Sequence, residues 1–132
     1  MALFDGKSEA FLREAHFAKL ATVMKDGSPH VTPIWYAYEA GKLMVNTTTD
    51  RVKYYNIKRD PRVCILVDNG YQYLMVFGKA RVAKERDAMK DIEALAVRYR
   101  GEEAGRKSAR DRYWKMDRVS IEIEPERVVS GL

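Results

Sequence analysis

The sequence predicts a mainly β protein, in which about six antiparallel strands form a barrel or a curled sheet with three short helices between them. Short segments of strand character recur along the chain, and most are joined by tight turns that contain Gly, Asn or Asp. Such turns join antiparallel strands, because a crossover between parallel strands needs a dozen or more residues. The 132 residues, 46% hydrophobic and 33% charged, are predicted to form one globular domain, 1–132.

The N-terminal third is predicted to contain one helix and two strands. An apolar stripe at helical spacing predicts a helix over Lys7–His16, and the strand Lys19–Met24 follows it. A turn around Gly27 leads into a second strand-like run, His30–Tyr38. This run contains Pro33, which cannot donate a hydrogen bond to a neighbouring strand and therefore predicts a sheet edge or an irregularity.

A short helix lies between two strands in the middle of the chain. The strand Leu43–Thr47 leads into a polar segment in which Asp50 is the predicted N-cap of the helix. Pro61 ends this helix, since proline lacks an amide donor and disfavours helical geometry in the preceding residue. An apolar strand over Arg62–Val67 follows, and Asp68–Gly70 is a predicted hairpin turn.

The C-terminal half begins with a long strand, Tyr71–Val82. The longest helix is predicted over Glu85–Arg100, where apolar residues form one stripe. Residues Glu102–Asp117 are polar and predict a loop or a short helix. Alternating residues predict a last strand over Val119–Glu124, interrupted by Pro125.

The start of the central helix is the best candidate binding site in the sequence. Hydroxyl and cationic side chains gather there: Thr47, Thr48, Thr49, Arg51 and Lys53. Hydroxyls and free helix amides donate to phosphate, the helix dipole favours negative charge, and arginine can bind two oxygens at once. The alternative interpretation is a solvated surface helix with no ligand.

Residues for catalysis without a cofactor are scarce. The sequence contains none of the nucleotide-binding, zinc-protease or serine-hydrolase motifs, and its histidines are His16 and His30. The single cysteine, Cys64, lies in an apolar strand and predicts a buried, unreactive thiol, with no disulfide and no metal site. An enzyme with this sequence is therefore expected to rely on a cofactor.

The net charge of +5 is concentrated in the segment Arg98–Arg118. This segment fits a nucleic-acid surface, the rim of an anionic ligand site or a plain basic surface. Because the sequence has no nucleic-acid motif, no nucleic-acid partner is expected. No apolar run approaches the roughly 20 residues that cross a bilayer, and no signal peptide is recognised. No membrane partner and a cytoplasmic location are therefore expected.

Three blocks of sequence carry a resemblance to a known family. The blocks are Leu20–Val23 with Asp26–Trp35, then Asn46–Lys53 with Asn56 and Arg59–Val63, and finally Gly78–Val82. They resemble, in order and spacing, the flavin/deazaflavin oxidoreductase superfamily, a group related to pyridoxamine 5′-phosphate oxidase. The likeness extends over about Phe11–Val129. It implies a six-stranded antiparallel split β-barrel with short helices, which forms a homodimer with two cofactor sites in grooves between the subunits.

The resemblance also implies the cofactor-binding residues. The strand that lies along the tricyclic ring would comprise Val31, Thr32, Pro33, Ile34 and Trp35. The phosphate would be held by Thr47, Thr48, Arg51 and Lys53. Asn56 matches a family position, although a structural role is equally open. From the partner subunit, Tyr71, Gln72 and Tyr73 would approach the ring.

Two cofactors are compatible with the resemblance, FMN and the deazaflavin coenzyme F₄₂₀, and the short Asp50–Lys53 pattern favours F₄₂₀. The expected activity is that of an F₄₂₀H₂-dependent oxidoreductase that transfers hydride to an unsaturated small-molecule acceptor. No catalytic residue is assigned, and His30, Tyr73 and water are all candidate proton donors. The alternatives are an FMN-binding flavoprotein, or a non-catalytic cofactor-binding or haem-binding protein on the same fold. True pyridoxamine 5′-phosphate oxidase activity is not expected, because no C-terminal extension follows Leu132.

Overall fold

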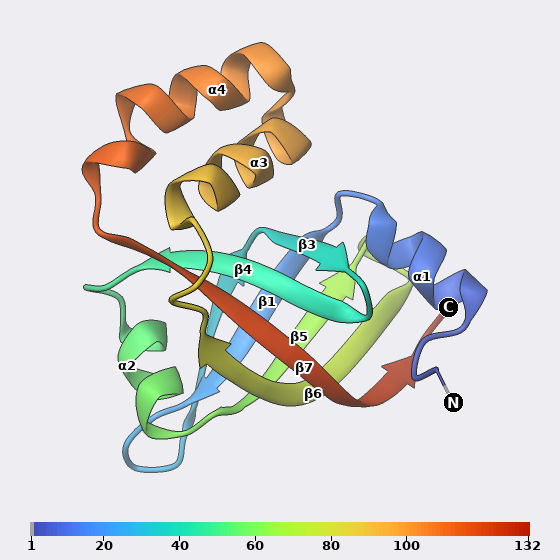
Figure 1. The fold of residues 1–132 in the computed structure, drawn as a ribbon. Coiled ribbons are helices and arrows are strands. Elements are labelled where there is room, and N and C mark those ends of the chain that lie inside the picture. Colours follow the sequence, from blue (N-terminus) through green and yellow to red (C-terminus); the bar gives the residue numbers. More distant parts are fainter. Residues whose placement is uncertain (1) are drawn as a thin grey trace.

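The computed structural model describes residues 2–132 and shows a curled antiparallel sheet with helices around it (Figure 1). The strands are β1 (Phe17–Val23), β2 (Pro29–Ile34), β3 (Tyr36–Glu39), β4 (Lys42–Thr48), β5 (Arg62–Asp68), β6 (Tyr73–Val82) and β7 (Arg118–Ser130). The helices are α1 (Gly6–Arg13), α2 (Val52–Arg59), α3 (Ala88–Arg100) and α4 (Glu102–Asp111), and the 3₁₀ turn η1 is Tyr113–Lys115. The predicted mainly β, antiparallel class is confirmed. None of the helices in residues 2–132 is long and apolar enough to cross a membrane.

The sheet has seven strands, one more than predicted, in the order β2-β1-β5-β6-β7-β4-β3. The extra strand arises because the predicted run His30–Tyr38 is divided at Trp35, where the chain leaves β1 and crosses to pair with β4. Both β2 and β3 are therefore edge strands, which confirms the edge position predicted from Pro33. The candidate site lies beside Trp35, where the chain passes from β2 to β3.

The prediction that Asp50 caps α2 is wrong. Its carboxylate accepts a hydrogen bond from Thr48 Oγ1 instead, and the N-cap residue of the helix is Arg51. No side chain within residues 2–132 accepts a hydrogen bond from the first amides of α2. The amide of Tyr54 donates to Arg51 O, so the amides of Val52 and Lys53 are the ones that remain available to a ligand. The helix ends before Pro61, as predicted.

The C-terminal half contains more regular structure than the sequence predicts. The segment Glu102–Asp117 forms α4 and η1, so residues 2–132 contain four α-helices rather than three. Gly105 allows α4 to pack closely on α3, because a Cβ at this position would lie 2.5 Å from Val97 N. Pro125 does not end the last strand: Glu126 has no partner in the β6–β7 pairing, which makes a β-bulge within β7.

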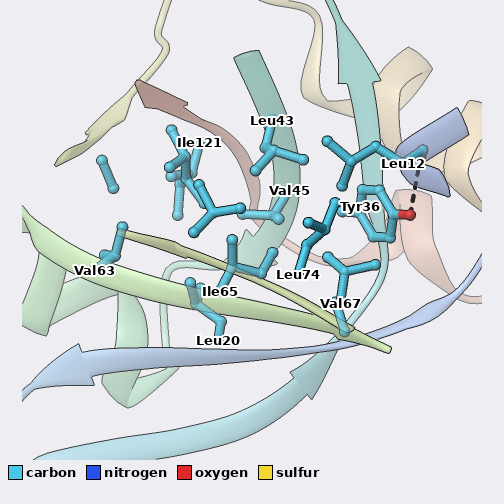
Figure 2. Packing of buried hydrophobic residues seen from close by; sticks show 14 of the residues in the cluster. Leu12, Leu20, Tyr36, Leu43, Val45, Val63, Ile65, Val67, Leu74 and Ile121 are labelled. Carbon is cyan, nitrogen blue, oxygen red and sulfur yellow. Dashed lines mark hydrogen bonds between the residues drawn. The ribbon is translucent and has the colours of Figure 1, made fainter. Parts of the chain in front are cut away.

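The main core fills the inside of the curled sheet. Figure 2 shows its side chains converging from several strands, with Tyr36 at the end near α1. Leu20, Ile65 and Val76 are each at most 1% exposed, and come from the adjacent strands β1, β5 and β6. The hydroxyl of Tyr36 lies 3.0 Å from Leu12 O and 2.8 Å from Glu14 O, which ties β3 to the end of α1.

A second apolar cluster lies between α3, α4 and β4. Its buried members include Met44, Ile92, Leu95 and Tyr113, and Trp35 packs against them. Figure 1 shows α3 and α4 lying together on one side of the sheet, away from α1 and α2. This cluster fixes the position of α3 and η1, which supply one wall of the candidate site.

Candidate functional site

A groove of about 540 Å³ lies at the opening of the curled sheet. Seven elements contribute to it, from β1 near the N-terminus to β7 at the C-terminus. Its lining residues are Phe17, Ala18, Thr32, Pro33, Ile34, Trp35, Asn46, Thr47, Thr48, Arg51, Lys53, Ile92, Leu95, Tyr113 and Arg118. The structure thus brings together most of the residues that the sequence predicted for a cofactor site.

One end of the groove is cationic. Thr47 and Thr48 end β4 and are buried, and Arg51 and Lys53 follow at the uncapped start of α2. Burial lowers the pKa of Lys53 below its usual value, and the nearby charge of Arg51 lowers it further. Within residues 2–132, neither cation forms an ion pair with a carboxylate. A bound anion would offset this charge.

Another wall of the groove is aromatic rather than cationic, and it is formed by Trp35 with the rings that pack on it. Trp35 stacks on Tyr99 with ring centroids 5.2 Å apart and an angle of 7° between the planes, and Tyr113 meets it edge-on at 6.2 Å. The guanidinium of Arg100 lies over the same indole ring at 5.5 Å. Trp35 is thereby held rigidly between β2 and the α3–η1 unit, and it presents a fixed apolar surface to the groove.

The edge strand β2 supplies Thr32, Pro33 and Ile34 beside this wall. Pro33 has no amide hydrogen, and Thr32 Oγ1 is buried without a hydrogen-bond partner in residues 2–132. A buried hydroxyl without a partner is unusual and can be satisfied by a ligand in the groove. The combination of an apolar wall, an unpartnered hydroxyl and a cationic end fits a flat heterocycle that carries a phosphate.

Asn46 and Arg118 also line the groove, and the sequence analysis assigned neither as a site residue, although Arg118 ends the basic segment that it named as a candidate rim of an anionic ligand site. Arg118 begins β7 and pairs with Thr48 in the β4–β7 register, which brings it to the cationic end. The only sequence signal for Asn46 is its polar side chain at the end of an apolar strand. No local pattern predicts that Arg118 lies beside Asn46, because 72 residues separate them in the chain.

Five predicted site residues do not line this groove. Val31 is 58% exposed on the edge strand β2. Asn56 is buried elsewhere, where its amide donates to Thr22 Oγ1 at 3.0 Å and its oxygen accepts from Arg59 at 2.8 Å. These bonds give Asn56 a structural role, one of the two roles that the sequence left open.

The remaining three residues, Tyr71, Gln72 and Tyr73, lie at the turn between β5 and β6. This turn is a four-residue loop rather than the tight hairpin predicted, because Asn69 Oδ1 accepts from the amides of both Tyr71 and Gln72. The strand β6 consequently begins at Tyr73. Tyr71 is 92% exposed, so it is accessible to another molecule. Neither tyrosine reaches the groove of its own chain.

Comparisons with known proteins agree with this geometry. The pattern of the family described as pyridoxamine 5′-phosphate oxidase matches residues 4–130. The chain is 33% identical over 125 residues to the F₄₂₀H₂-dependent biliverdin reductase of Mycobacterium tuberculosis (strain CDC 1551 / Oshkosh), covering 92% of this chain and 84% of the relative. Among solved structures, an F₄₂₀ reductase is similar with 31% identity and a TM-score of 0.70, over 92% of this chain and 94% of the other.

A conserved hypothetical protein from Mycobacterium tuberculosis is also similar, with 27% identity and a TM-score of 0.79. That alignment covers 98% of this chain and 86% of the other. The resemblance noted in three sequence blocks is thus confirmed over nearly the whole length. The protein belongs to the pyridoxamine 5′-phosphate oxidase family and has its split-barrel-like fold.

Proposed function

We propose that this protein is an F₄₂₀H₂-dependent oxidoreductase that transfers a hydride to an unsaturated small-molecule acceptor. The observation that carries this proposal is the groove, in which a rigid aromatic wall leads to cations without carboxylate partners. The family membership and the likeness to two F₄₂₀-dependent reductases support the choice of cofactor. FMN has the same two requirements, a flat ring and a phosphate, and is the second candidate.

Each part of the groove has a role in this proposal. Arg51 and Lys53 bind the phosphate of the cofactor together with the hydroxyls of Thr47 and Thr48. The strand segment 32–35 lies against the ring, and its apolar side chains keep water from one face. F₄₂₀H₂ supplies the hydride, so the protein's own task is to position the acceptor and exclude solvent.

The positions of His30 and Tyr73 reduce the set of candidate proton donors. His30 does not line the groove, and its Nδ1 is buried without a partner in residues 2–132. Tyr73 is the first residue of β6 and does not line the groove of its own subunit. Of the three candidates, these positions favour water as the proton donor in a single subunit, and they leave Tyr73 a role only across a subunit interface.

Haem binding on this fold is less consistent with the groove. A haem iron needs an axial ligand such as His, Cys, Met or Tyr. Of these residue types, the described lining contains Tyr113 alone. The guanidinium of Arg118 lies over the ring of Tyr113, with 4.9 Å between them, so that side chain is already engaged.

The test is a titration of the purified protein with F₄₂₀ and, separately, with FMN, followed by fluorescence. We expect tighter binding of F₄₂₀ than of FMN, and oxidation of F₄₂₀H₂ that depends on an added acceptor. Biliverdin is the first acceptor to try, because the Mycobacterium tuberculosis relative is named for it. Preferred binding of FMN would move the function to flavin chemistry, and binding without turnover would indicate a cofactor carrier.

We also propose that the protein is a cytoplasmic homodimer in which Tyr71, Gln72 and Tyr73 reach the partner's groove. The exposure of Tyr71, together with the exposed apolar residues Val31 and Val129, supports a surface that another protein subunit covers.

Sedimentation at micromolar concentration is expected to give twice the 15.2 kDa chain mass. Tyr71→Ala is expected to weaken cofactor binding, although it leaves its own groove intact. A monomer that binds cofactor with full affinity contradicts this arrangement.

A further inference from the structure

Arg118 is a half-buried cation in the wall of the groove whose donors are only partly used. Its Nη1 donates to Asn46 Oδ1 at 3.2 Å, and its Nη2 donates to the sulfur of Met116 at 3.3 Å. Its Nε is buried and has no hydrogen-bond partner within residues 2–132. Arg81 and Arg86, by contrast, both form ion pairs with carboxylates. Arg118 therefore retains donor capacity that a ligand in the groove can use.

The charge around Arg118 also favours an anion. Burial lowers the pKa of Arg118, and the nearby cations Arg51 and Arg112 lower it further, although Tyr113 and Asp50 act in the opposite sense. Positive charge thus accumulates here, and within residues 2–132 neither Arg118 nor Arg51 forms an ion pair with a carboxylate. A phosphate in the groove would relieve this repulsion and accept from the guanidinium of Arg118.

The orientation of Asn46 follows from its neighbours. Its Nδ2 lies 3.0 Å from Ala88 O, which can only accept, and 3.4 Å from Ser120 Oγ. Because a carbonyl oxygen cannot donate, the amide nitrogen and not the amide oxygen must face Ala88 O. The amide oxygen is then directed to Arg118, where it accepts from Nη1. Asn46 is 6% exposed, so water does not replace these partners readily.

Ser120 and Asp91 reinforce this orientation from behind. Burial raises the pKa of Asp91, but the hydrogen bonds from Arg86 and Ser120 lower it more, so its carboxylate is ionised at neutral pH. Ser120 Oγ donates its single proton to Asp91 Oδ2 at 2.6 Å. Ser120 can therefore only accept from Asn46. The buried chain of hydrogen bonds runs from Asp91 to Arg118 with one consistent direction.

We propose that Arg118 is an anion-binding residue of the groove and that Asn46 is a positioning residue that holds it there, with its orientation set by Ser120 and Asp91. The proposal rests on the proposed function only in taking the cofactor's phosphate as the natural anion. Arg118 then supplies a third cation beside Arg51 and Lys53. It reaches the site from the first residue of β7, which pairs with Thr48 of β4.

The first test needs no cofactor. Inorganic phosphate is titrated into ¹⁵N-labelled protein, and the arginine Nε–H signals are followed by NMR. The Arg118 signal, assigned by its loss in Arg118→Met, is expected to shift with saturation. In Asn46→Leu that shift is expected to disappear or to require more phosphate. An Arg118 signal that does not respond to phosphate in the wild type overturns the proposal, whether or not F₄₂₀ binds.

The second test compares F₄₂₀ with its phosphate-free deazaflavin riboside. Arg118→Met is expected to weaken F₄₂₀ binding by about tenfold to a hundredfold, because one charge-assisted hydrogen bond is lost. Asn46→Leu is expected to weaken it by roughly fivefold, because Arg118 loses its anchor. The affinity for the riboside is expected to be unchanged in both variants. Thermal unfolding confirms that each variant is folded.

Two further variants complete the comparison. Arg127→Met removes the same charge from an exposed residue outside the groove lining, and is expected to change F₄₂₀ affinity less than twofold, because solvent and salt screen its charge. Ser120→Ala removes only the hydroxyl behind Asn46, and keeps the proposal testable if Asn46→Leu does not fold. Equal losses for F₄₂₀ and the riboside would assign Arg118 and Asn46 a structural role only. If the wild type binds neither F₄₂₀ nor FMN, the proposed function fails, and the phosphate titration still decides the role of Arg118.

Discussion

Replacing Arg51 and Lys53 together by alanine is expected to weaken F₄₂₀ binding by about a hundredfold to ten-thousandfold. In the proposed complex each residue would supply a charge-assisted hydrogen bond to phosphate, and neither has a carboxylate partner in residues 2–132 to hold instead. The measurement is a fluorescence titration at fixed ionic strength with F₄₂₀ and with its phosphate-free riboside. Only the affinity for F₄₂₀ is expected to fall.

A matched control removes the same charge elsewhere. Lys25 and Lys58 are exposed and do not line the groove, so Lys25→Ala with Lys58→Ala is expected to change F₄₂₀ affinity by only about twofold. Equal losses in the two double variants would show that the affinity depends on net charge rather than on specific contacts.

In the wild type, the affinity for F₄₂₀ is expected to fall as the pH rises toward 10.5. The pKa of Lys53 lies below that value, and the neutral amine no longer attracts the negative charge of the phosphate.

Tyr36→Ala is expected to lower the free energy of unfolding by about 3–5 kcal/mol, because a large side chain is removed from the core. Tyr36 is 0% exposed, and its hydroxyl donates to the end of α1. Tyr36→Phe removes only the hydroxyl and is expected to lower it by about 0.5–1.5 kcal/mol. Its cost is that of one hydrogen bond, because Arg98 Nη2 still donates to both Leu12 O and Glu14 O. Urea unfolding monitored by fluorescence measures both. Tyr38→Phe, in a partly exposed side chain that donates to Glu9, is expected to have a smaller effect.

The same urea unfolding, repeated at alkaline pH, is expected to give a result that is specific to Tyr36. Burial raises the pKa of Tyr36 far above the 10.0 that applies in the unfolded chain. The native state therefore binds the phenolic proton more tightly, and this contribution to stability is complete below pH 10 and is lost as the pH rises above it. Tyr36→Phe is expected to show a shallower loss of stability over that range. Identical slopes in wild type and variant would contradict a buried, neutral phenol.

The sequence alone was enough to predict the elements that depend on neighbouring residues. Apolar alternation and the turn glycines located the strands, and Pro61 located the end of α2. The core of the cationic site was also predictable, because Thr47, Thr48, Arg51 and Lys53 follow one another at a strand end and a helix start. The same local reasoning failed at Asp50, where a hydroxyl two residues earlier competes with the helix amides for one carboxylate.

Only the tertiary structure decided what the rest of the groove contains. Trp35 lies between β2 and β3, where the chain crosses to the opposite edge of a curled sheet. Its indole is held by Tyr99 and Tyr113 from a distant helical unit. Arg118 meets Asn46 because β7 pairs with β4, a strand that lies far from it in sequence order. Periodicity reports which face of an element is apolar. Strand register, which depends on pairing across the whole sheet, determines which polar residues share a groove.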